Sequence, residues 1–62
     1  MDCIDVIKIV KRNGWVLNRI KGSHYHFKHS AIKGLVTIPF HRKKNIHPGI
    51  LRNISRSTGI SF

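Results

Sequence analysis

The short length of the chain limits its fold more than any other feature, because 62 residues can enclose only one small hydrophobic core. A domain of this size buries only about 60% of the surface that its unfolded chain exposes, so its stability is marginal. Cys3 is the only cysteine, which excludes a disulfide framework and suits a reducing compartment. We therefore expect one domain over residues 1–62, with Cys3 packed in its first helix.

Helical spacing of apolar residues marks both ends of the chain. Near the start, an apolar stripe from Cys3 to Val10 follows a plausible N-cap, Asp2, and stops at Asn13-Gly14, which predicts a helix over residues 2–13. A second helix is expected to begin at Pro48, whose missing N–H is tolerated in a first turn, and to end at Gly59.

The segment between these helices has the character of strands. Residues 15–21 are rich in β-branched and aromatic side chains and end at the turn signal Gly22-Ser23. Residues 24–29 alternate, so that Tyr25 and Phe27 point to one face of the strand and His24, His26 and Lys28 to the other. Residues 35–40 form a third strand, in which Pro39 indicates an edge or an end.

The order of elements predicts an α+β fold, α-β-β-β-α, with a three-stranded antiparallel sheet and both helices on one face. Tyr25, Phe27, Val36 and Ile38 would lie beneath the helices. The histidines at 24 and 26 would lie on the open face. The first strand does not alternate clearly, so its faces stay unassigned.

Charge indicates what the protein binds. Twelve Lys and Arg against two Asp give a formal net charge of +10, which attracts polyanions and favours as the partner either nucleic acid or an acidic protein that mimics or blocks it. No apolar run approaches the ~20 residues of a transmembrane helix, and charged residues interrupt the N-terminal apolar segment, so neither a membrane span nor a signal peptide is predicted. We expect a cytoplasmic protein without a membrane partner.

The scarcity of acids limits the chemistry. Many nucleases hold divalent ions with carboxylates, but Asp2 and Asp5 are the only acids and both lie near the start of the first helix. We therefore expect no metal and no cofactor. Histidine remains for proton transfer, since its ordinary pKa of about 6.5 suits this at cellular pH, and RNA supplies its own nucleophile, the 2′-hydroxyl.

Five histidines compete for this role. His24 is favoured because it follows Gly22-Ser23, where a glycine permits close approach to a phosphate, and because its strand holds it rigidly. His26 and His41 are candidate accessory residues, with a solvated bystander as the alternative for His26 and an ordinary loop histidine as the alternative for His41, whereas His29 and His47 resemble turn or cap positions. The alternative for His24 is a solvated polar side chain without a function.

Two further patterns in the sequence concern metal and phosphate binding. His24, His26 and His29 form an H-x-H-x-x-H spacing that would suit zinc, but a zinc site usually needs three or four converging ligands and His29 should face the other way. The run Arg42-Lys43-Lys44 precedes the second helix and is expected either to contact phosphate or to be a solvated surface.

Several segments follow one another along the chain in a characteristic order: Gly14-Trp15, Arg19 to His24, Phe27, Val36 to Pro39 with His41, Pro48 to Arg52 with Ile54, and Gly59-Ile60-Ser61. These segments carry a resemblance to the HicA toxin family that covers essentially the whole chain. The resemblance implies a fold like a double-stranded-RNA-binding domain. It also implies a type II toxin that cleaves mRNA to inhibit translation and is held inactive by a cognate HicB antitoxin.

The family's catalytic histidine lies in its Gly-Ser-His motif, which corresponds to His24 here. We expect a metal-independent endoribonuclease with His24 as general base or acid. The residues expected to bind RNA are Arg19, Lys21, Gly22, Ser23, Lys28, Arg42, Lys43 and Lys44. The alternative is a non-catalytic RNA-binding module of the same fold.

Overall fold

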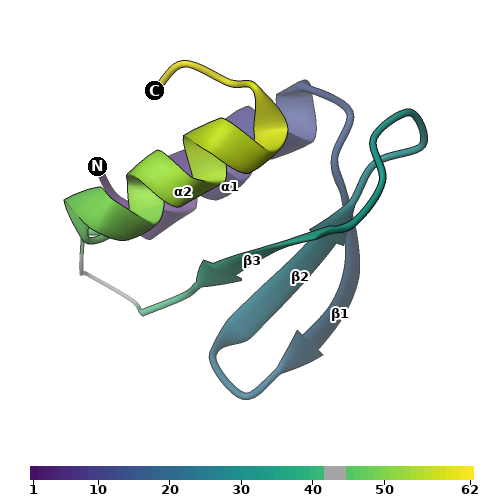
Figure 1. Cartoon of the computed structure of the whole chain (residues 1–62). Helices are drawn as coiled ribbons and strands as arrows, with labels where there is room; N and C mark the ends of the chain where they lie inside the picture. Colours follow the sequence, from purple (N-terminus) through teal and green to yellow (C-terminus); the bar gives the residue numbers. More distant parts are fainter. Residues whose placement is uncertain (42–44) are drawn as a thin grey trace.

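The computed structural model describes residues 1–41 and 45–62 and has the predicted order of elements (Figure 1). The elements are α1 (Cys3–Arg12), β1 (Val16–Lys21), β2 (His24–Lys28), β3 (Leu35–Pro39) and α2 (Pro48–Thr58). The strands form an antiparallel sheet in the order β1-β2-β3, and both helices lie on the same side of it. The fold class predicted from the sequence is therefore confirmed.

Helix α1 begins and ends where its sequence predicts. The Asp2 carboxylate accepts a hydrogen bond from the Ile4 N–H at 3.0 Å, and so satisfies a backbone donor that has no partner within the helix. At the other end, Gly14 adopts a φ of 90° and donates to the Lys11 carbonyl, while the Trp15 N–H donates to the Val10 carbonyl. This pair of bonds is a Schellman motif, which turns the chain towards the sheet.

This motif explains a small difference from the prediction. Trp15 was expected inside the first strand, but its N–H closes the helix, so β1 begins at Val16. The Trp15 side chain is buried in the core instead.

The core lies between the helices and the strands β2 and β3. Phe27 and Ile38 are fully buried there, as the alternation of their strands predicts, and Val36 is buried beside them. Helix α1 contributes Cys3, Val6 and Val10, and α2 contributes Ile54. Tyr25 is only half-buried and stacks at a tilt on Phe40, with ring centroids 4.9 Å apart.

Helix α2 is closed at both ends by its flanking residues. His47 is its N-cap, and its ring nitrogen Nδ1 accepts a hydrogen bond from the Gly49 N–H at 3.0 Å. Gly59 ends it in the left-handed conformation. The backbone before the helix is tied to the N-terminus, because the Ile46 N–H donates to the Met1 carbonyl at 2.8 Å.

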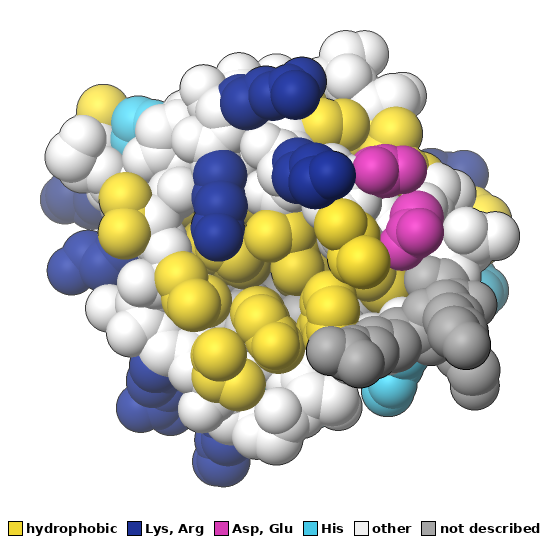
Figure 2. Space-filling view, turned by 180° about the vertical axis from the view of Figure 1, so that it is seen from behind, with side chains coloured by type: hydrophobic (Ala, Val, Ile, Leu, Met, Phe, Trp, Pro, Cys, Tyr) yellow, Lys and Arg dark blue, Asp and Glu magenta, His cyan; other side chains and the backbone are white. Residues whose placement is uncertain are grey.

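The helices do not cover strand β1, and all six of its residues are exposed. Leu17 pairs with Phe27 and Ile20 with Tyr25, so both apolar side chains point to the helix side of the sheet. They stay 37% and 52% exposed, respectively. Figure 2 shows hydrophobic side chains gathered on this side of the molecule, bordered by Lys and Arg. We call Leu17, Ile20, Tyr25 and Phe40 the apolar strip.

Candidate active site

The open face of the sheet, away from the helices, gathers polar and basic side chains from all three strands. Across the sheet, Lys21, His24 and Pro39 are register partners in one row. The next row consists of Arg19, His26 and Thr37. The strands thus bring two histidines and two cations from different parts of the sequence onto one surface.

His24 is the first residue of the central strand β2. It follows a two-residue turn in which Gly22 has a φ of 61°, a conformation that favours glycine. The backbone next to His24 is fixed from the other side as well, because the Phe40 N–H donates to the Ser23 carbonyl at 2.7 Å. The imidazole is therefore exposed on a backbone that is held by a neighbouring strand on each side.

A β-bulge decides which residues of β1 share this face with His24. The pairing register shifts between Leu17 and Arg19, so Asn18 is an extra residue opposite β2. Without the bulge, simple alternation would place Leu17 on the same face as Arg19 and Lys21. The bulge moves Leu17 to the helix side and explains why the strand showed no clear alternation.

His26 lies on the same face, but its ring contacts a side chain of the neighbouring strand. Its Nδ1 lies 2.9 Å from the Thr37 hydroxyl in the adjacent strand, and the residue is half-buried. This contact involves Nδ1 and fixes the plane of the ring, so Nε2 is the ring nitrogen that does not take part in it. Thr37 has no motif that marks it as a site residue, although alternation along β3 places its side chain on the face opposite the buried Val36 and Ile38.

His29 is not directed to the open face. Its Nε2 lies 3.0 Å from the Asn13 carbonyl, and its Nδ1 accepts from the Ala31 N–H at 3.0 Å. The ring also packs at a tilt on Trp15, with centroids 5.1 Å apart. Since Nδ1 accepts, Nε2 carries the hydrogen and donates to Asn13. The H-x-H-x-x-H spacing therefore does not converge on a common point.

The remaining predicted residues are distributed as follows. Lys28 lies on the open face at the far end of β2, and Gly22 and Ser23 form the turn before His24. His41 is exposed just after β3. Arg42, Lys43 and Lys44 lie outside the described residues. Within residues 1–41 and 45–62, no three His, Cys, Asp or Glu side chains gather in a way that could hold a metal ion.

The open face carries cations but neither of the two acids of the chain. Arg19, Lys21 and Lys28 are exposed there, whereas Asp2 and Asp5 belong to the start of α1. An anionic ligand on this face would meet positive charge beside an exposed imidazole.

No helix in the described part of the chain is both long enough and apolar enough to span a membrane.

These features define a small basic domain with an exposed histidine on its sheet. Its α-β-β-β-α fold is like that of double-stranded-RNA-binding domains. The family described as the HicA toxin of bacterial toxin–antitoxin systems matches residues 4–60, and the chain belongs to this family. Its role is that of a toxin, and the family implies an antitoxin as its partner. A comparison with curated proteins gives no match.

Proposed function

We propose that the protein is a metal-independent endoribonuclease that cleaves mRNA and so inhibits translation. The observation that carries this proposal is the placement of His24, whose exposed imidazole stands on the central strand among cations contributed by β1. RNA in the cytoplasm is the substrate, so the protein would act there.

The chemistry needs only two proton transfers. A 2′-hydroxyl attacks the adjacent phosphorus, its proton leaves to a base, and the bond from phosphorus to the 5′-oxygen of the next nucleotide breaks. The products are a 2′,3′-cyclic phosphate and a 5′-hydroxyl that takes up a proton. His24 performs one of these transfers as general base or acid. Lys21 and Arg19 stabilise the additional negative charge on the pentavalent phosphorus.

His26 and His41 are the accessory candidates for the second proton transfer. His26 is the better placed, because Thr37 holds its ring on the same face as His24 and, among the described residues, leaves Nε2 available. The backbone at Gly22 and Ser23 allows a phosphate to approach the turn, and Lys28 extends the basic track along β2. Arg42, Lys43 and Lys44 would add phosphate contacts next to His41.

The test is cleavage of RNA by the purified chain in EDTA. We expect fragments with 2′,3′-cyclic ends from the native chain and none from His24→Ala. A matched substrate with a single 2′-deoxy nucleotide at the cut should resist at that position only. Equal cleavage of DNA, or full activity of a folded His24→Ala chain, would refute the proposal. Loss of native activity in EDTA would instead indicate a metal.

A non-catalytic RNA-binding module is the second candidate, and the basic open face favours it equally. The same assay separates the two, since a binding module would retain intact RNA.

A HicB-type antitoxin is the proposed protein partner, and the apolar strip is where we expect it to dock. Exposed apolar patches commonly mark protein interfaces. Lys8, Lys11 and Arg12 are exposed on the neighbouring α1, and the net charge of +10 opposes association of two copies of this chain. An acidic partner with apolar side chains complements this surface.

A further inference from the structure

We propose that a hollow at the far end of the open face binds one nucleotide of the RNA and thereby sets where the strand is cut. The inference rests on the proposed function and names a second contact point for the same substrate. The hollow has a volume of about 580 Å³ and is lined by Asn18, Lys28, residues 29–34 and Leu35. Its size lies within the range of about 300–1,000 Å³ that is typical of small-ligand sites.

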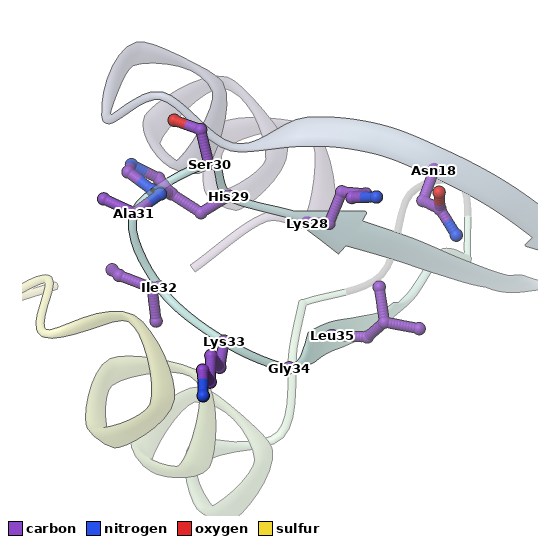
Figure 3. A pocket seen from close by; sticks show the side chains of 9 residues that line it. All are labelled: Asn18, Lys28, His29, Ser30, Ala31, Ile32, Lys33, Gly34 and Leu35. Atoms are coloured by element: carbon purple, nitrogen blue, oxygen red, sulfur yellow. Dashed lines mark hydrogen bonds between the residues drawn. The ribbon is translucent and has the colours of Figure 1, made fainter.

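The side chains at the hollow can contact three parts of a nucleotide: the edge of its base, the face of its base and its phosphate. Figure 3 shows Asn18, Lys28 and Leu35 reaching it from β1, β2 and β3. The Asn18 amide has both a donor and an acceptor for the edge of a base. The Lys28 ammonium can pair with a phosphate, and Leu35, which is 53% exposed, gives an apolar surface for the face of a base.

Asn18 owes its place to the bulge in β1. Two residues of β1 oppose one residue of β2 at this point, which adds a side chain to the strand without removing Arg19 from its place opposite His26. Bulges frequently redirect a side chain next to a functional site. The bulge thus lets β1 contribute both Arg19 beside the histidines and Asn18 beside the hollow.

The loop that closes the hollow is anchored before any ligand arrives. The His29 ring joins it to the end of α1, through the Asn13 carbonyl on one nitrogen and the Ala31 N–H on the other. The anchor is tight, since a Cβ added to Gly14 would lie 2.8 Å from the His29 Nε2. A preformed loop lowers the entropic penalty of binding.

The distance between the hollow and His24 explains how binding of a nucleotide in the hollow would control where the strand is cleaved. Lys28 is four residues from His24 along β2, which corresponds to about 14 Å at the rise of an antiparallel strand. A single strand that follows β2 can place one nucleotide in the hollow and a phosphate a few nucleotides away at His24. The cut would then occur at a fixed distance from the base that Asn18 recognises.

The first experiment maps the cut positions on a long RNA. For the native chain we expect a base preference at one position, a constant number of nucleotides from the cut. Asn18→Ala and Asn18→Asp should weaken that preference about tenfold, as expected for the loss of an amide contact to a base. The matched control, Asn53→Ala, removes an exposed amide from α2 and should leave it unchanged. Unchanged preference in both folded Asn18 variants would overturn the proposal.

A binding experiment keeps this inference distinct from the cleavage mechanism. Chemical-shift changes are followed in a His24→Ala chain that is titrated with the four 5′-mononucleotides and with inorganic phosphate. We expect at least one nucleotide to shift the Asn18 side-chain amide and the Gly34 N–H more strongly than phosphate does. Shifts confined to the turn at Gly22, or identical for phosphate and all nucleotides, would refute the hollow as a nucleotide site. Either result stands whether or not the native chain cleaves RNA.

Discussion

Replacing His29 by alanine should destabilise the protein far more than replacing His24, although both histidines come from the same short segment. The His29 ring makes two hydrogen bonds and packs on Trp15. Each hydrogen bond contributes about 0.5–1.5 kcal/mol, and a ring contact contributes about 0.5–1.5 kcal/mol more. The free energy of unfolding should therefore fall by roughly 2–4 kcal/mol.

That loss is large for a chain of 62 residues. At about 0.05–0.15 kcal/mol per residue, the free energy of unfolding of the native chain is roughly 3–9 kcal/mol. His29→Ala should thus remove a large share of it, and the melting temperature should fall by about 10 °C or more. His24 is exposed, so His24→Ala should change the free energy of unfolding by less than about 0.5 kcal/mol.

The assay is urea unfolding followed by circular dichroism on the native chain, His29→Ala and His24→Ala, with His41→Ala as a second exposed control. RNA cleavage is measured on the same samples at a temperature where all are folded. The expected pattern is opposite for the two sites: His29→Ala loses stability, and His24→Ala loses cleavage. Equal unfolding midpoints for His29→Ala and His24→Ala would refute the reasoning about the His29 contacts.

Three further predictions follow from the packing and the charges. Phe27→Ala should lower the free energy of unfolding by about 3–5 kcal/mol, because Phe27 is fully buried, and urea unfolding followed by circular dichroism should show a correspondingly lower midpoint. Ile20→Asp should weaken binding of the antitoxin, measured by calorimetry, while RNA cleavage persists; unchanged affinity would exclude the apolar strip as the interface. If Arg19, Lys21 and Lys28 each contact a phosphate, the log of RNA affinity should fall with log salt at a slope of about −2 or steeper, and a flat response would contradict phosphate-led binding.

Much of the candidate site could be predicted because β2 alternates without interruption. Tyr25 and Phe27 point to the core, so His24 and Lys28 must point to the open face, which the structure confirms. The turn and cap positions expected for His29 and His47 are also confirmed, as their hydrogen bonds to nearby N–H groups show. These features depend on neighbours within a few residues along the chain.

Other features depend on residues that are distant in sequence. Asn18 became recognisable as part of the open face only through the register with β2, and Thr37 became recognisable as the partner of His26 only through their cross-strand contact, because a bulge and a cross-strand contact are properties of paired strands. Similarly, nothing in the spacing of His29 indicated that its ring would reach back to Asn13 at the end of α1.

The sequence by itself determined the elements and their inward and outward faces, because helical spacing, strand alternation and turn residues act locally. Only the tertiary structure decided which outward residues meet: it placed Arg19 and Lys21 beside the histidines, directed His29 away from them, and left the helix side of β1 uncovered. The physical reason is that register, bulges and helix placement arise from contacts between segments, and a linear pattern of residue types does not specify those contacts.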